Sequence, residues 1–207
     1  MARAIFTKKE LARYLALGRE LIFDVIYDST LITTGANDTL FQVPIGQTGN
    51  GFAVPKTVFH TNMETAGKLP NNEEFRILGY GMWVQPVGND TNKGWWDADA
   101  TTTIDFLAAL SHGFVKIRLE NKDYRYIPIA MLSNVRVHPD HDIPDVINVC
   151  IESPLVRNTG FLALRAPVHI SAGRQIGVDV DLAAPPGEDN PFHLYFGFWG
   201  VRIRSVQ

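Results

Sequence analysis

The sequence has 207 residues, of which 45% are hydrophobic and 20% charged, so it can build its own core and is too apolar to be disordered throughout. The net charge of −3 argues against a protein whose whole surface binds nucleic acid, and the single cysteine excludes an internal disulfide. The 17 glycines and 12 prolines favour many short strands over a few long helices.

The first 20 residues are a basic segment on an otherwise acidic chain. Five lysines and arginines stand against two glutamates, which gives a net charge of +3 and leaves −6 on the rest of the chain. Such a segment can be an arm that contacts an anionic surface, such as phosphate or lipid headgroups. The alternative is a helix packed on its own domain with solvated lysines. The basic residues are Arg3, Lys8, Lys9, Arg13 and Arg19.

A short helix is expected within this arm. Thr7 and Glu10 have the spacing of a capping box, which opens a helix, and Gly18 is suited to end it. A helix of about ten residues is marginal alone, so it should dock on something. Its apolar residues on one face are Leu11, Tyr14 and Leu15.

From about residue 21 onward the dominant period is two, which is typical of antiparallel strands with one solvated face. Val115, Ile117 and Leu119, for example, alternate with charged residues. Turn-forming residues separate the apolar segments. The expected strands are 39–45, 75–87, 115–119, 124–132, 146–152, 161–170, 176–182 and 192–204, with an additional one near 21–33.

One helix interrupts this series, because Thr103 can cap a helix over Ile104–Leu110, between the second and third strands counted from residue 39. Eight antiparallel strands with uneven connections predict an all-β fold, a single eight-stranded jelly-roll sandwich over residues 21–207. In that topology the last strand lies in the middle of a sheet. An immunoglobulin-like sandwich is the nearest alternative, but it has tighter loops and about 100 residues.

Two of these strands are apolar on both faces. In the strand expected over 75–87, Phe75, Ile77 and Trp83 fall on one face. Tyr80 and Met82 fall on the opposite face. A strand that is apolar on both faces needs a second partner beyond its own core, which can be a loop, the N-terminal helix or a neighbouring subunit. We therefore predict subunit contacts in both strands. The candidates are Tyr80 and Met82 in the earlier strand and Tyr195 and Trp199 in the last one.

A further candidate is the Trp95-Trp96 pair, which sits in a polar loop over residues 89–99. An exposed tryptophan pair can fill a pocket on another subunit or stack on sugar rings. The third possibility is a loop folded over its own sheet.

No catalytic constellation is visible in the sequence. The Gly-x-Ser-x-Gly, Gly-x4-Gly-Lys-Ser/Thr and His-Glu-x-x-His motifs are absent, so we expect neither an enzyme nor a cofactor. His138, His141 and the nearby carboxylates supply metal-ligand types, but their spacing fits no closed zinc site. We expect a polar turn there. A cupin-like metal enzyme is a remote alternative, because its His-x-His motif is missing.

The segment Thr61–Pro70 has the sequence Thr-Asn-Met-Glu-Thr-Ala-Gly-Lys-Leu-Pro, and the apolar strand that begins Phe75-Arg76-Ile77 follows it. This segment resembles the major capsid proteins of tailless icosahedral bacterial viruses with jelly-roll shells. The closing strand Leu194–Val206 is similar to the last strand of such shells. The two segments cover about 35 residues. Members of that group often carry two jelly rolls, whereas this chain has room for one.

The resemblance implies a structural protein of the virion, assembled in the host cytoplasm. Its partners would be copies of itself, as a trimer or pentamer, and other capsid proteins, while the arm contacts genome or an internal membrane. A carbohydrate-binding module on the same sandwich is the alternative function. Capsid interfaces repeat one contact many times, so modest burial per contact is multiplied by symmetry.

Overall fold

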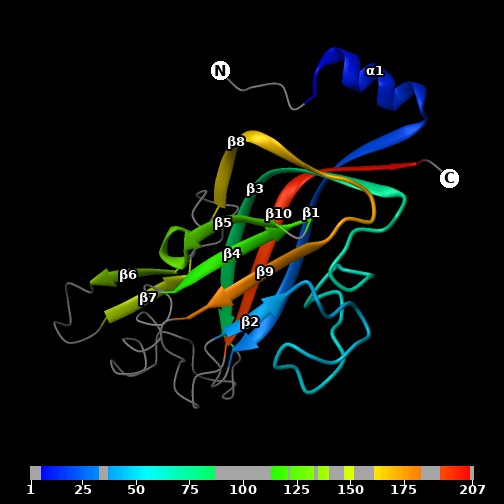
Figure 1. Ribbon diagram of the computed structural model, residues 1–207. Helices are drawn as coiled ribbons and strands as arrows, with labels where there is room; N and C mark the ends of the chain where they lie inside the picture. Colours follow the sequence, from blue (N-terminus) through cyan, green and yellow to red (C-terminus); the bar gives the residue numbers. More distant parts are fainter. Residues whose placement is uncertain are drawn as a thin grey trace.

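The structure is a computed structural model, and it describes residues 6–32, 37–86, 113–120, 122–132, 135–139, 147–151, 161–182 and 192–205. Within these residues, two four-stranded antiparallel sheets form a β-sandwich, and one short helix precedes the first strand (Figure 1). A two-stranded sheet extends from one side of the sandwich. Both ends of the described chain lie at the same end of the molecule.

The first sheet has the strand order β1-β10-β3-β8 and the second has the order β2-β9-β4-β5. The first contains β1 (Arg19–Ile32), β10 (Phe192–Ser205), β3 (Glu73–Pro86) and β8 (Phe161–Ile170). The second contains β2 (Asn37–Leu40), β9 (Ile176–Asp181), β4 (Phe114–Leu119) and β5 (Lys122–Pro128), which a 3-10 turn over Ile129–Met131 follows. The two-stranded sheet pairs β6 (Val135–Pro139) with β7 (Ile147–Ile151), and the helix α1 is Lys8–Ala16.

The period-two analysis finds most strands within a few residues of their ends, and the C-terminal strand lies mid-sheet as predicted. The eight sandwich strands, however, are not the eight expected. The segment near 21–33 is β1 and belongs to the sandwich, whereas 146–152 is β7 and pairs outside it with β6. β6 escaped prediction because its alternation is very short.

One predicted strand boundary needs correction, and one predicted helix lies outside the described residues. The strand expected over 39–45 ends at Leu40, because Phe41 has a φ of 71°, which no strand can accommodate. The described segment between β2 and β3 contains no helix. The helix expected over Ile104–Leu110 lies outside the described residues.

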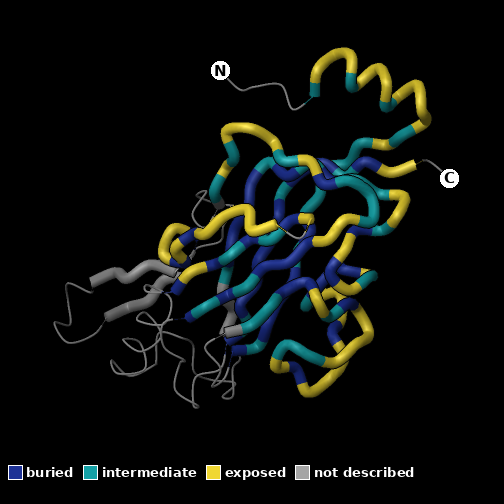
Figure 2. The backbone as a smooth tube through the Cα atoms, viewed as in Figure 1, coloured by how far each residue is buried: buried dark blue, intermediate teal, exposed yellow. Residues whose placement is uncertain are grey.

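The core lies between the two sheets, and one face of β10 supplies its largest side chains. Phe192, Leu194, Phe196 and Phe198 alternate along β10 and are all fully buried. Figure 2 shows buried residues along the strands of the two sheets, in contrast to the largely exposed helix α1. Val178 of β9 and its neighbours meet the β10 side chains from the second sheet. The alternation predicted for this strand is therefore confirmed.

A bulge in β3 overturns the prediction that this strand is apolar on both faces. Against β10, the register shifts between Ile77 and Gly79, which leaves Leu78 as one extra residue in β3. Because an extra residue reverses the alternation, Tyr80 and Met82 share the inner face with Phe75 and Ile77 rather than opposing it. Tyr80 is 1% exposed and Met82 0%.

The segment over residues 41–72 covers the free edge of β1, and we call it the covering segment. Asn62 accepts from the backbone N–H of Tyr27 through its side chain (2.9 Å) and donates to the carbonyl of Val25 (2.6 Å). Its neighbour Thr61 forms a β-bridge with Asp28. An exposed strand edge is a template for unwanted pairing, so this cover protects the sheet. Thr61 and Asn62, part of the segment that carries the capsid resemblance, thus have a structural role here.

A buried ion pair fastens the same segment to β1. The Lys56 amine lies 2.8 Å from a carboxylate oxygen of Asp28 and donates a second hydrogen bond to the carbonyl of Ser29 (2.5 Å). The other oxygen of Asp28 accepts from the backbone N–H of Phe41 (2.5 Å). Both charged side chains are 0% exposed. Burial raises the pKa of Asp28 and lowers the pKa of Lys56, while the charge of each partner opposes the shift.

Candidate functional site: the outer aromatic face and the helical arm

The face of the first sheet that points away from the core is rich in aromatic side chains. Its residues alternate with the core residues, as the strand register requires: Phe23 of β1 is opposite Val201 of β10, and Tyr27 is opposite Gly197. Phe23 is 74% exposed and Phe59, from the covering segment, is 79% exposed. We call this surface the outer aromatic face, and it comprises Phe23, Tyr27, Phe59, Trp83, Tyr195 and Trp199.

Gly197 makes room for the two indole rings of this face. A Cβ at this position would lie 3.1 Å from ring atoms of both Trp83 and Trp199. The two rings meet edge to face with centroids 5.8 Å apart, and Trp83 also stacks on Tyr195 at 5.2 Å, with an angle of 6° between the planes. These aromatic contacts hold the rings in fixed orientations on the sheet.

The outer aromatic face is hollowed at the end far from α1. The hollow has a volume of about 460 Å³. Its floor comes from β1, β10 and β3, and one wall comes from the covering segment. The lining residues are Tyr27, Val58, Phe59, His60, Trp83, His193 and Tyr195.

Two histidines that are far apart in the sequence, His60 and His193, meet in this hollow. The rings of His60 and His193 are 5.8 Å apart, and both pack on Phe52, at 4.5 and 5.3 Å. Burial lowers the pKa of both histidines. The charge of Lys56 lowers the pKa of His60 further, and the neighbouring His60 lowers the pKa of His193. Both rings are therefore neutral at pH 7.

The helix α1 docks on the first sheet through a small polar and aromatic contact. The capping box predicted from Thr7 and Glu10 is present, and Gly18, with a φ of 62°, follows the helix as expected. Glu10 forms an ion pair with Arg76 of β3 (2.9 Å), and the Phe6 ring lies 4.4 Å from the same guanidinium. These hydrogen bonds from Arg76 and Thr7 lower the pKa of Glu10 to about 2.

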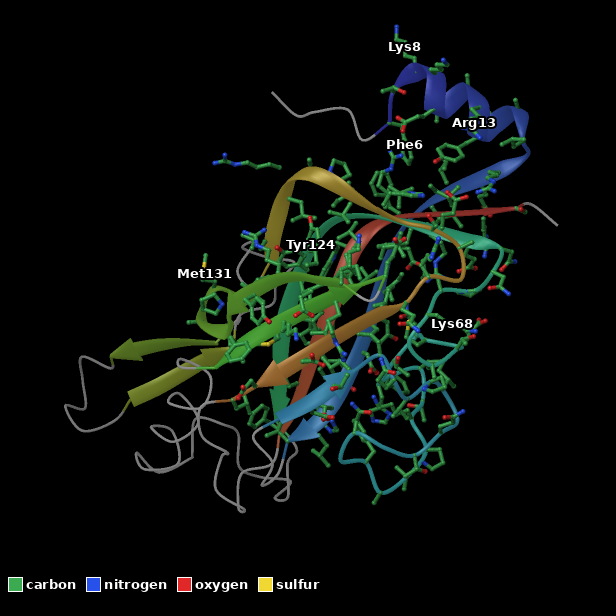
Figure 3. The ribbon with its side chains drawn as sticks, viewed as in Figure 1. Phe6, Lys8, Arg13, Lys68, Tyr124 and Met131 are labelled. Carbon is green, nitrogen blue, oxygen red and sulfur yellow. The ribbon has the colours of Figure 1, made fainter. Side chains whose placement is uncertain are left out.

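The rest of α1 faces solvent, and no residue of the helix is buried. Figure 3 shows Phe6 turned toward the sandwich and Lys8 pointing away from it. The exposed face carries apolar side chains as well as cations. Leu11 is 41% exposed, Leu15 64% and Leu17 58%, beside the exposed Lys8, Lys9 and Arg13.

Three of the five residues predicted for the basic arm lie together on α1, namely Lys8, Lys9 and Arg13. Arg19 does not belong to the arm, because it is the first residue of β1 and forms an ion pair with Glu74. Arg3 lies outside the described residues.

The residues predicted for subunit contact fall into three groups. Tyr195 and Trp199 lie on the outer aromatic face, where Tyr195 is 7% exposed and Trp199 is half-buried. Tyr80 and Met82 are core residues, so their side chains offer no surface to a second subunit. The pair Trp95 and Trp96 lies outside the described residues. The polar turn expected around His138 and His141 needs correction, because His138 belongs to strand β6, while His141 lies outside the described residues.

The described part of the chain contains no group of three His, Cys, Asp or Glu side chains placed to hold a metal ion. It also contains no helix long and apolar enough to cross a membrane. No protein-family model matches the chain, and the comparison with curated proteins gives no match. The fold and the two surfaces described above therefore define the class of protein, a β-sandwich with an N-terminal helix.

Proposed function

We propose that the sandwich is a single jelly roll. The support is the nesting of its strand pairs: β1 pairs with β10, β2 with β9, β3 with β8, and β4 with β5. The first half of the chain thus runs antiparallel to the second half as one long ribbon, folded over to make two sheets. That nesting is the order of a jelly roll, with the β6–β7 hairpin inserted between β5 and β8.

The function that fits this fold and surface best is that of a virion shell protein that assembles with copies of itself. The observation that carries the proposal is the part of the outer aromatic face next to α1, where the Phe23 side chain is 74% exposed to solvent. Large exposed apolar patches mark interaction sites, and aromatic residues are enriched at interfaces. The resemblance of Thr61–Pro70 to jelly-roll capsid proteins supports the same function.

Replacing Phe23 by Ser tests this function. We expect the wild-type protein to form trimers, pentamers or larger shells, and Phe23→Ser to raise the dissociation constant of that assembly by about tenfold or more, because an aromatic anchor is lost. Light scattering after size-exclusion chromatography and negative-stain imaging give the measurement. Since Phe23 is 74% exposed, the variant should keep its fold.

The matched control is Tyr124→Ser, which removes an exposed aromatic side chain from β5 on the second sheet (Figure 3). It should leave the assembly unchanged. A wild-type protein that remains a monodisperse monomer at high concentration contradicts the shell function, and equal effects of the two substitutions contradict the assignment of the outer aromatic face.

The helix α1 is proposed to contact an anionic partner inside the particle. Exposed leucines beside Lys8, Lys9 and Arg13 favour an anionic lipid surface over nucleic acid. A lipid surface buries Leu15 and its neighbours, whereas phosphate contacts alone leave these side chains exposed to water. The sandwich itself should not need this helix, because α1 docks mainly through Glu10 and Phe6.

Removing residues 1–17 should therefore leave the sandwich folded and weaken binding to anionic vesicles. The deletion stops at residue 17 because β1 begins at Arg19. Cosedimentation with phosphatidylcholine vesicles that contain phosphatidylglycerol gives the measurement, and the binding of the full chain should fall as salt rises. Unchanged vesicle binding after the deletion, or binding to DNA alone, contradicts a lipid-facing arm.

A further inference from the structure

The hollow in the outer aromatic face has the size of a small-molecule site. Its volume of about 460 Å³ lies within the range usual for ligand pockets. It lies around Tyr27, four residues along β1 from Phe23, so it is separate from the part of the face next to α1. A ligand bound there would contact three adjacent strands and the covering segment.

The walls of the hollow present flat aromatic surfaces that the core does not use. Trp83 is held by its stack on Tyr195, so its ring needs no reorientation when a ligand binds. Phe59 is 79% exposed and stands at the rim on the covering segment. Aromatic faces of this kind attract the weakly positive C–H groups of a saturated ring, because the face of an aromatic ring is negative.

Polar groups are present among these rings, but they are neutral. Nδ1 of His193 is buried and has no hydrogen-bond partner among the described residues. Nδ1 of His60 accepts from the backbone N–H of Thr57 (3.1 Å), so the proton of the neutral ring is on Nε2, which is a donor. An unpaired buried nitrogen is costly unless water or a ligand satisfies it.

Among the described residues, no Lys, Arg, Asp or Glu lines the hollow, and the nearby Lys56 is engaged by Asp28. A phosphate or a carboxylate would therefore lose its hydration without gaining an ion pair. The ligand that fits is neutral, with apolar C–H faces and hydroxyl groups around its edge. We propose that the hollow binds a neutral sugar ring of a glycan, an activity that goes beyond shell assembly.

The experiment is saturation-transfer difference NMR on the full-length protein with the methyl glycosides of glucose, galactose, mannose and N-acetylglucosamine. At least one of these probes should bind. Phe59→Ala should weaken that binding by about fivefold, since one aromatic wall is removed. His193→Phe, which keeps a ring but removes the unpaired nitrogen, should weaken it as well.

Tyr124→Ala is the control, because it removes an exposed aromatic ring from the second sheet and should leave binding unchanged. Weakening by either hollow variant supports the proposal. Absence of binding by all four probes, or binding that neither Phe59→Ala nor His193→Phe weakens, overturns it. Adenosine serves as a further probe, and binding of this nucleoside in preference to every glycoside also overturns it. Light scattering on the same samples reports shell assembly separately.

Discussion

Replacing Lys56 by Met is expected to destabilise the sandwich by about 3 to 5 kcal/mol, because it leaves the carboxylate of Asp28 buried without its counter-charge. Both side chains are 0% exposed, and the amine lies 2.8 Å from the carboxylate. The loss also frees the carbonyl of Ser29, which accepts from the same amine. Urea denaturation of the wild type and the variant gives the free energies of unfolding.

Two further variants separate the ion pair from the general effect of losing a lysine. Lys68→Met changes an exposed lysine of the same covering segment and should alter stability by less than about 0.5 kcal/mol. The double variant Asp28→Leu/Lys56→Met removes both charges and should be more stable than Lys56→Met alone, because no isolated charge remains buried. If Lys56→Met were as stable as Lys68→Met, the pair would not fasten the covering segment to β1.

The strands could be predicted because each one alternates locally. Ile176, Val178 and Val180 show this in β9, where they alternate with Gly177, Asp179 and Asp181. The same period identifies the inner face of β10. The helix α1 could also be predicted from the sequence, because Thr7 and Glu10 form its capping box within four residues. In each case, the determining contacts lie close together in the sequence.

The bulge of β3 and the hollow depend on contacts between distant segments, so the sequence does not reveal them. One extra residue near Leu78 moves Tyr80 and Met82 into the core. Gly79 and Gly81 indicate a bend within this strand, but they do not reveal the extra residue. His60 and His193 meet only because the covering segment folds back along β1 to reach the end of β10. Lys56 lies in a stretch that resembles a solvated loop, although its amine is fully buried.

The covering segment links the stability of the fold to the candidate site. It shields the edge of β1 through Asn62 and Lys56, and it contributes Phe59 and His60 to the hollow. Because the ion pair holds the segment against β1, Lys56→Met should also disturb the hollow. Phe59→Ala, by contrast, changes an exposed side chain and should leave the edge covered. The two substitutions thus distinguish loss of the site from loss of the fold.

The second large effect is expected for Gly200→Ala, which should destabilise the protein by about 3 kcal/mol or more. Gly200 lies in the central strand β10, opposite the bulge of β3. A Cβ at this position would lie 2.1 Å from the backbone oxygen of Arg76 and 2.7 Å from a ring carbon of Phe75. Neither atom is the end of a flexible side chain, so the two strands would have to separate. Thermal and urea denaturation measure the change.

Gly177→Ala is the matched control, because Gly177 is also a buried glycine within a sandwich strand, β9. Its added Cβ would lie no closer than 3.6 Å to Arg118 and Gln42, which is ordinary van der Waals contact. The substitution should therefore change stability by no more than about 1 kcal/mol, and it can stabilise the fold by reducing the entropy of the unfolded chain. Similar losses in the two variants would indicate a general intolerance of alanine in these strands, and would contradict the close approach of β10 to β3 at the bulge.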